Sequence, residues 1–159
     1  MASRARILSR LDGSSPAPQQ MRTRVYVAPR NKTGFLNVDL EIRSRSQAGL
    51  DELAAGLGKS VSVLYSGPVD RRLYLLSLEL SADRRKGPDA VVHALCLLIE
   101  KLAPGPRQVW KTSQKHFDVG YKLDPFERSL QFTLRVDTLQ RVASLGAHLA
   151  VTCYNSSVE

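Results

Sequence analysis

The sequence predicts an α+β fold, and two adjacent segments of different periodicity carry most of this prediction. Residues 73–80 (LYLLSLEL) are apolar on both alternating faces, apart from Ser77 and Glu79, as expected for a strand inside a sheet. Residues 88–103 place apolar side chains three and four positions apart, which is the spacing of a helix with one wide buried stripe. We expect this strand and this helix to form the core.

The segment before this core predicts a strand, a helix and a second strand. Residues 36–43 alternate between apolar and polar side chains, so they predict a strand with one solvated face. Ser44 or Ser46 can cap a helix that ends at Gly58, and residues 61–65 follow as a strand. A turn is expected at residues 66–70. The side chains expected to face inward are Leu36, Val38, Leu40, Ile42, Leu50, Leu53, Ala54 and Leu57.

The segment after the core predicts three more strands and a further helix. The Pro-Gly-Pro sequence at residues 104–106 ends the long helix, and residues 110–114 read as a short helical piece. Residues 117–121, 130–136 and 149–154 read as strands. Between the last two strands, Asp137 is expected to cap a helix ending at Gly146, with Leu139, Val142 and Ala143 facing inward.

The order of these elements predicts one domain over residues 22–159. From residue 36 the order is β-α-β-β-α-β, which matches the ferredoxin-like, split β-α-β layout. A C-terminal β-α-β unit would extend this core. We therefore expect a mixed sheet with its helices mainly on one face.

A basic leading segment accounts for most of the net charge of +8. Residues 1–32 hold seven basic residues and one acidic residue, whereas the remainder is nearly balanced. Residues 1–21 are rich in Gly, Ser, Pro and Gln and are expected to be disordered, and Met21 is an alternative start of the chain. Because the domain itself is nearly neutral, nucleic-acid binding is not expected.

The composition predicts a cytoplasmic protein that does not enter a membrane. No apolar run reaches the roughly 18 residues that a membrane span requires, and the first residues lack the apolar centre of a secretory signal. Cys96 lies on the buried stripe of the long helix, and Cys153 shares a strand face with Leu149 and Val151. Both cysteines are expected to be buried apolar side chains without a disulfide.

No motif in the chain specifies a reaction, and no cofactor or metal is expected. Phosphate-binding glycine loops are absent from the sequence, and His93, His116 and His148 do not have the spacing of metal ligands. Asp39 and Glu41 point to the same side of one strand, where they either solvate it or pair for acid–base chemistry. The expected set of catalytic residues is empty.

Basic residues around the core strand are the candidate binding residues. They can form a site for an anion or an acidic partner, or they can be solvated loop charges. The sole tryptophan is either an exposed interface anchor or a core residue beneath the long helix. The candidate residues are Arg71, Arg72, Arg84, Arg85, Lys86, Arg107 and Trp110.

From about residue 36 the chain resembles an uncharacterised bacterial family of small proteins that contain a domain of unknown function. The resemblance is carried by residues 36–40 (LNVDL), 97–104 (LLIEKLAP) and, most clearly, 137–154 (DTLQRVASLGAHLAVTCY). It implies no known activity, and proteins of this kind are sometimes suspected to be immunity partners of secreted toxins.

These observations predict a non-enzymatic cytoplasmic protein of the immunity or antitoxin type. Its expected partner is a protein, and the analogy with that family suggests a toxin. The alternative is a small-molecule sensor module, and a small enzyme is less favoured. The wet face of residues 36–43 has no aromatic side chain to stack on RNA bases, which again argues against nucleic acid. A homodimer through an unpaired sheet edge is plausible.

Overall fold

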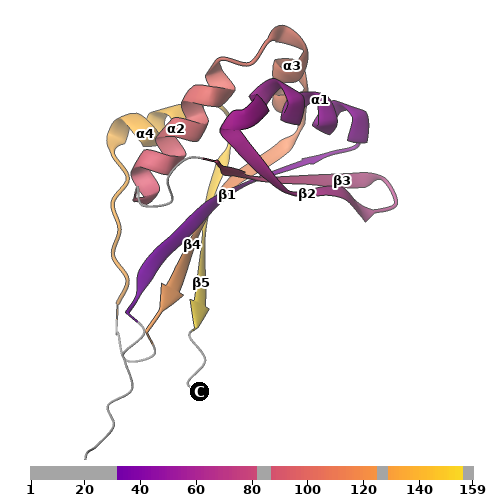
Figure 1. The fold of residues 1–159 in the computed structure, drawn as a ribbon. Helices are drawn as coiled ribbons and strands as arrows, with labels where there is room; N and C mark the ends of the chain where they lie inside the picture. Colours follow the sequence, from indigo (N-terminus) through magenta and orange to yellow (C-terminus); the bar gives the residue numbers. More distant parts are fainter. Residues whose placement is uncertain (1–31, 82–86, 125–128, 156–159) are drawn as a thin grey trace, which may run out of the picture.

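The fold is organised around the central strand of a five-stranded sheet with the order β2-β3-β1-β4-β5. The computed structural model describes residues 32–81, 87–124 and 129–155 of the chain. Within these residues four α-helices accompany a mixed sheet, which confirms the expected α+β class (Figure 1). The leading segment that was expected to be disordered, residues 1–21, lies outside the described residues.

The central strand β1 (Gly34–Ser44) follows the alternation that predicted it, with one exception. Val38, Leu40 and Ile42 are at most 1% exposed, while the polar residues between them lie on the opposite face. Leu36 was expected to be inward but is 42% exposed. The register with β4 shifts between Phe35 and Asn37, so the simple alternation is lost at this position.

Strands β2 (Val61–Asp70) and β3 (Leu73–Leu80) form an antiparallel hairpin beside β1. The strand at residues 73–80 is therefore confirmed with the expected bounds. The expected turn at residues 66–70 is wrong, because β2 continues to Asp70 and the chain turns at Arg71 and Arg72. Pro68 is accommodated because β2 is an edge strand, where a missing backbone N–H is tolerated.

Helices α1 (Gln47–Leu57) and α2 (Pro88–Glu100) supply most of the cover over the sheet. The Ser46 hydroxyl accepts a hydrogen bond from the Gly49 N–H, and Gly58, with a φ of 61°, donates its N–H to Ala54 at the other end of α1. The apolar stripe of α2 is buried as expected except at Leu98, which is partly exposed, and the helix ends at Glu100 and not at residue 103. The buried members of this stripe are Val91, Val92, Leu95, Cys96 and Ile99.

Helix α3 (Pro104–Thr112) is longer than the short helical piece expected at residues 110–114. The proline-rich sequence at residues 104–106 does separate α3 from α2, but it also starts the new helix, with Pro104 in its first turn. Proline suits this place because the first backbone N–H groups of a helix have no partner within it. The helix ends at Thr112, and Gln114 already belongs to the next strand.

Strand β4 (Gln114–Leu123) and strand β5 (His148–Asn155) pair in parallel, with helix α4 (Val136–Ser144) between them in sequence. The expected strand at residues 130–136 is wrong, because residues 129–135 have no regular structure. Their apolar side chains still reach the core, and the Phe132 ring lies 5.4 Å from the Tyr121 ring. The alternation of residues 130–136 therefore reflects their contact with the core and not a strand. The edge of β4 is occupied by β5 instead.

Helix α4 presents a different face to the core from the one expected. Thr138 and Val142 are buried, whereas Leu139 is 44% exposed and Ala143 is exposed too. Arg135 occupies the N-cap position without a side-chain hydrogen bond, so the expected cap at Asp137 is also wrong. The face of α4 that packs on the core is rotated by about a quarter of a turn from the face that the apolar residues predicted.

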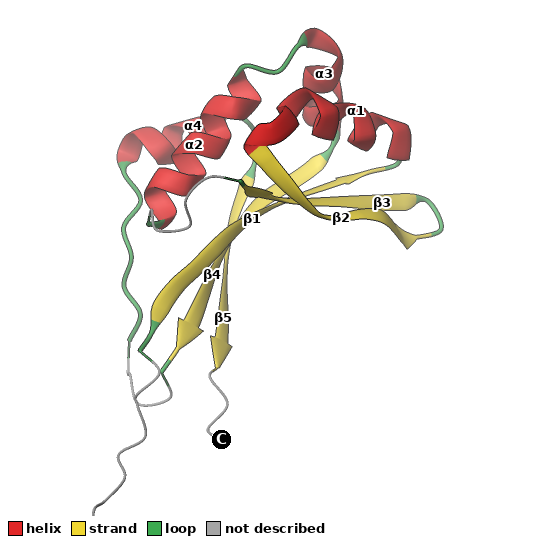
Figure 2. Ribbon diagram, in the orientation of Figure 1, coloured by secondary structure: helices red, strands yellow, loops and turns green. Residues whose placement is uncertain are grey.

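All four helices lie on one side of the twisted sheet (Figure 2). The core fills the space between them and the sheet, and Trp110, Phe117, Leu40 and Leu95 are among its largest fully buried side chains. No helix of the described residues covers the other side of the sheet. We call this side, which carries Asn37, Asp39, Glu41 and Arg43 of β1 and the residues paired with them, the open face.

Candidate functional site

The open face is the candidate functional site, because it aligns acidic side chains from three neighbouring strands. In the registers of the sheet, Asp39 of β1 lies directly opposite Glu79 of β3 on one side and Asp118 of β4 on the other. Glu41 follows two residues after Asp39 on the same face of β1. We call Glu79, Asp39 and Asp118 the carboxylate row. Like charges directly opposite each other in a sheet repel.

Two neutral donors hold Asp39, the middle member of the carboxylate row, and Asp118, at one of its ends. The Asn37 amide donates a hydrogen bond of 2.7 Å to Asp39, and the Thr152 hydroxyl of β5 lies 2.8 Å from both oxygens of Asp118. The amide of Asn37 lies over Gly120, where an added Cβ would come within 2.7 Å of the Asn37 oxygen. A side chain at position 120 would therefore displace the Asn37 amide from its present position.

A second pairing on the open face joins Glu41 with one imidazole. The His116 Nε2 atom lies 3.4 Å from the Glu41 carboxylate, and Arg43 lies 3.3 Å from the same oxygen. The side chains of Glu41 and His116 are 24% and 28% exposed, so both remain within reach of a partner. Glu79, in contrast, is only 9% exposed, although it belongs to the same face.

A cleft of about 450 Å³ lies at the C-terminal end of β3, between the start of β2 and α2. Its wall is apolar, with Leu80, Leu97 and Leu98, and Lys59 and Lys101 lie at its rim. The size falls in the range of small-molecule sites. This arrangement suits a ligand that combines an apolar body with a negative group.

A second cleft of about 420 Å³ is polar and lies beside the first turn of α1. Arg43 and Arg45 line it together with Ser44, Ser46 and Thr112. The Ser46 hydroxyl is already used as the cap of α1, and Arg43 is paired with Glu41. The polar groups of this cleft are therefore largely committed to the fold.

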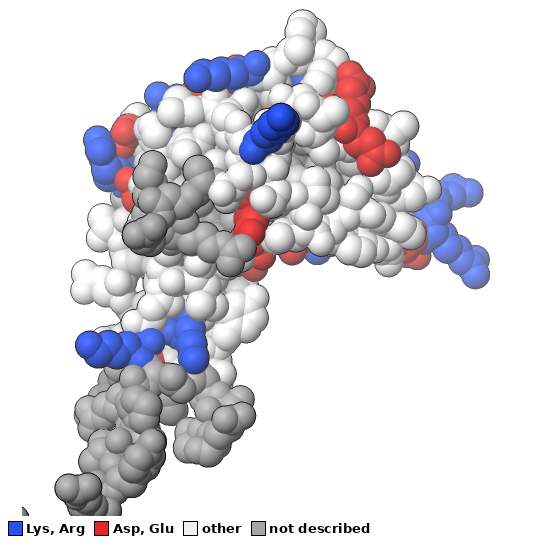
Figure 3. Space-filling model, viewed as in Figure 1, with Lys and Arg blue, Asp and Glu red and all other residues white. Residues whose placement is uncertain are grey.

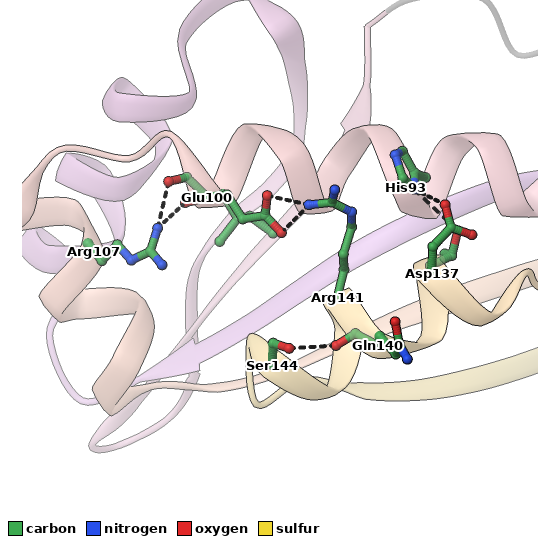
Figure 4. A network of polar contacts seen from close by, with 9 residues as sticks. His93, Glu100, Arg107, Asp137, Gln140, Arg141 and Ser144 are labelled. Atoms are coloured by element: carbon green, nitrogen blue, oxygen red, sulfur yellow. Dashed lines mark hydrogen bonds and ion pairs between the residues drawn. The ribbon is translucent and has the colours of Figure 1, made fainter.

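The basic residues named from the sequence do not form one site. Arg71 and Arg72 lie at the exposed turn between β2 and β3, and Figure 3 shows basic side chains at the tip of this hairpin. Arg84, Arg85 and Lys86 lie outside the described residues. Arg107 donates hydrogen bonds to the carbonyl oxygens of Ile99 and Glu100, so it caps the end of α2 (Figure 4).

Trp110 is a core residue and not an exposed anchor, since it is only 2% exposed. Its indole N–H donates to the Leu145 carbonyl oxygen. The ammonium group of Lys115 lies 5.3 Å from the Trp110 ring and donates to the Trp110 carbonyl oxygen at 2.8 Å. Burial lowers the pKa of Lys115, because the charged form loses its hydration.

The histidines serve local contacts. His93 of α2 lies 3.3 Å from the Thr138 hydroxyl and 3.9 Å from Asp137 of α4, next to the ion pair between Arg141 and Glu100 (Figure 4). Among the described residues no group of three or more histidine, cysteine, aspartate or glutamate side chains is placed to hold a metal ion.

The two cysteines differ in environment, which corrects the expectation that both are buried. Cys96 is fully buried, and this burial, together with the charge of Glu100, raises the pKa of its thiol to about 12. Cys153 is exposed on the edge strand β5. The strand pattern predicted on which side of the sheet Cys153 lies. It did not predict that α4 leaves this end of β5 uncovered.

Sequence reasoning singled out Asp39 and Glu41 but did not predict the row that Asp39 forms with Glu79 and Asp118. Glu79 read as a break in an apolar strand, since only the strand register shows which residue lies opposite it. A signal was present: each of the three strands carries at least one carboxylate, with two on β1. Combining these signals requires the strand order, which one sequence does not reveal.

The fold and the site stand without a known relative to explain them. Comparison with protein-family models, with curated proteins and with solved structures finds no match to this chain. The resemblance to uncharacterised bacterial proteins therefore stays a prediction. No helix in the described part of the chain has the length and apolar character needed to cross a bilayer.

Proposed function

We propose that this chain is a non-enzymatic cytoplasmic binding protein whose open face recognises a basic surface on a protein partner. The carboxylate row of Glu79, Asp39 and Asp118 is the observation that supports the proposal. Carboxylates gathered on one face of a sheet attract cationic side chains of a partner. Asp118 and the neighbouring Glu41 are the partly exposed carboxylates that such a partner could reach.

The hydrogen bonds of the row favour binding over catalysis. Asn37 and Thr152 hold two of its carboxylates, so the surface is already formed before a partner arrives. A preformed surface loses little conformational freedom on binding. The same negative charges would repel the phosphates of a nucleic acid. A basic protein is therefore the favoured partner.

The arrangement of strands β1 to β4 supports a ferredoxin-like core within this proposal. The sheet order β2-β3-β1-β4 and the antiparallel pairs β1–β3, β2–β3 and β1–β4 are those of the split β-α-β layout. Strand β5 would be its C-terminal extension. An immunity or antitoxin role fits such a rigid module, and a homodimer formed through a sheet edge would leave the open face uncovered.

The test is binding to the product of a neighbouring gene, measured with the full chain and two neutralising substitutions. Asp118→Asn and Glu41→Gln together should weaken the complex at least tenfold and reduce its salt dependence, because long-range attraction is lost. Glu52→Gln, on the exposed side of α1, is the matched control and should leave the affinity unchanged. Equal affinity of all three proteins, or no complex and no protection of cells, would overturn the proposal.

A small-molecule sensor is the second candidate, and the cleft beside α2 is the observation that favours it. The apolar wall of Leu80, Leu97 and Leu98 and the rim lysines Lys59 and Lys101 suit a carboxylate with an aliphatic chain. A thermal-shift series with C6 to C12 fatty acids tests this. Stabilisation that grows with chain length and disappears in Leu97→Asp supports a sensor, whereas no shift across the series counts against it.

A further inference from the structure

The outer edge of β5 lacks the features that normally protect a sheet edge from pairing. Its eight residues, His148–Asn155, contain no Asp, Glu, Lys, Arg, Pro or Gly. They pair with β4 in parallel over their whole length without a register shift. Natural edges are usually blunted by charges, proline or bulges. An edge without them is a template for another strand.

The other edge of the same sheet, β2, has two features that oppose pairing with a further strand. Strand β2 has two register shifts against β3, between Val63 and Tyr65 and between Pro68 and Asp70. It also contains Pro68, which has no backbone N–H to offer a neighbour. The contrast singles out β5 as the edge that can accept a strand.

Apolar side chains accompany the unprotected edge. Val151 is 43% exposed and Tyr154 is 52% exposed, and the Cys153 side chain is exposed between them. Leu139 of α4, the helix that leads into β5, is 44% exposed as well. Burying such side chains stabilises a complex by about 25 cal/mol for each Å² removed from water. Within the described residues nothing pairs with this edge (Figure 1).

We propose that the edge pairs antiparallel with β5 of a second copy of this chain, with Val151 on the two-fold axis. A two-fold axis normal to the sheet makes neighbouring strands antiparallel and keeps the helices of both copies on the same side. Residues opposite each other then lie on the same face of the sheet. Because odd-numbered and even-numbered residues of β5 lie on different faces, an odd residue pairs with an odd one and an even residue with an even one. Centring on Val151 places Leu149 opposite Cys153 of the other copy and His148 opposite Tyr154.

This register makes the contact self-complementary. On the helix side, Val151 meets its own copy, and the pairs of Leu149 with Cys153 flank it, which forms one apolar strip. On the open side, Ala150 meets Thr152, and neither residue is charged. Because β5 contains no Asp, Glu, Lys or Arg, pairing brings no like charges of these residues together. A second copy therefore fits without any change in sequence.

The dimer goes beyond the proposed function, because it uses the edge of β5 and not the carboxylate row. It would join the two sheets into one of ten strands, since each copy contributes the five strands of its sheet. Both open faces would lie on the same side of this sheet. A partner with two basic patches could then contact both rows at once, and the gain would come from effective concentration.

Sedimentation equilibrium of the full chain tests the pairing. We expect the unaltered protein to be a dimer at micromolar concentration and Val151→Lys to raise the dimer dissociation constant at least 100-fold. Lysine on a strand edge opposes pairing but is tolerated in the isolated domain because position 151 is exposed. Val63→Lys, at a similarly exposed position of β2, is the matched control and should remain dimeric. Unchanged circular dichroism and melting would show that both variants fold.

Oxidation with diamide tests the register. Cα atoms directly opposite in an antiparallel pair lie about 4.5 or 5.5 Å apart, which a disulfide can bridge. The double variant V151C/C153S should therefore form a disulfide-linked dimer, whereas the unaltered chain, with Cys153 away from the axis, should not. A monomeric unaltered protein, or linkage through Cys153 in place of position 151, would overturn the proposal. Neither result depends on whether the open face binds a basic protein.

Discussion

The indole N–H of Trp110 donates a hydrogen bond of 3.0 Å to the main-chain carbonyl oxygen of Leu145, and this bond joins α3 to the end of α4. Both residues are buried, at 2% and 8% exposure, so the carbonyl oxygen has little access to water. The two residues are 35 positions apart in the chain. The contact therefore connects the C-terminal unit of the fold with the helices that follow the core strand.

Replacing Trp110 with phenylalanine should reduce the free energy of unfolding by about 2–4 kcal/mol. The substitution leaves the Leu145 carbonyl oxygen without its donor and also creates a small cavity, and each effect costs roughly 1–3 kcal/mol. Urea unfolding followed by circular dichroism measures the change. Lys111→Ala, on the exposed side of the same helix, should change stability by less than about 0.5 kcal/mol. A W110F variant as stable as the unaltered protein would contradict the buried bond.

The ion pair between Arg141 and Glu100 should contribute much less than the Trp110 bond. Their shortest contact is 2.5 Å, but the side chains are 35% and 32% exposed, so water screens the interaction. We expect a coupling energy of at most about 1 kcal/mol in a double-mutant cycle with Arg141→Met and Glu100→Gln. A coupling above about 2 kcal/mol would show that the pair is shielded from solvent in solution.

Gly120→Ala should destabilise the domain by about 1–3 kcal/mol. The added Cβ would come within 2.7 Å of the Asn37 oxygen, so the Asn37 amide must move and lose its bond to Asp39. Gly34→Ala is the control, because its Cβ would have no neighbour closer than 3.9 Å. Thermal melting should show a clear loss for the first variant and a change near zero for the second, and equal melting temperatures would contradict the described packing.

Thiol labelling should distinguish the two cysteines. In the V151K variant, which is expected to be monomeric, Cys153 is exposed and should react with a disulfide reagent at pH 8, whereas Cys96 is buried and should react only after unfolding. The expected counts for this variant are one reactive thiol in the native state and two in urea, and the C153S variant should have none in the native state. Rapid labelling of Cys96 in the folded protein would show that α2 opens readily.

The Cys96 thiol should also contribute a loss of stability above pH 9. Its pKa rises from 9.0 to about 12 in the folded protein, chiefly through burial. Stability from this group is therefore complete below pH 9 and is lost as the pH rises toward 12, because the unfolded chain ionises first. The slope is at most about 1.4 kcal/mol per pH unit.

The difference between the unaltered protein and Cys96→Ala isolates this contribution. Burial lowers the pKa of Lys115, so this residue increases the stability of the folded protein as the pH rises. The pKa of Tyr121 is raised, so Tyr121, like Cys96, decreases the stability at alkaline pH. Both residues are common to the two proteins, so their effects cancel in the comparison. Parallel pH profiles for the two proteins would contradict a buried, neutral thiol at position 96.

The sequence by itself determined the elements whose residues interact mainly within their own segment. The period of α2, a serine cap at position 44 or 46, the glycine at position 58 and the alternation of residues 37–43 are local signals, and the structure shows each of them, with the cap at Ser46. Such patterns act over one or two turns of backbone, so no other part of the chain is needed to interpret them.

Only the tertiary structure decided which residues face one another. Residues 130–136 alternate like a strand, but β5 occupies the edge of β4, so the same pattern becomes irregular chain over the core. The carboxylate row of Glu79, Asp39 and Asp118 exists only because β1 lies between β3 and β4 in this register. A shift by one residue would reverse the faces of a strand, and the register is set by contacts between distant segments.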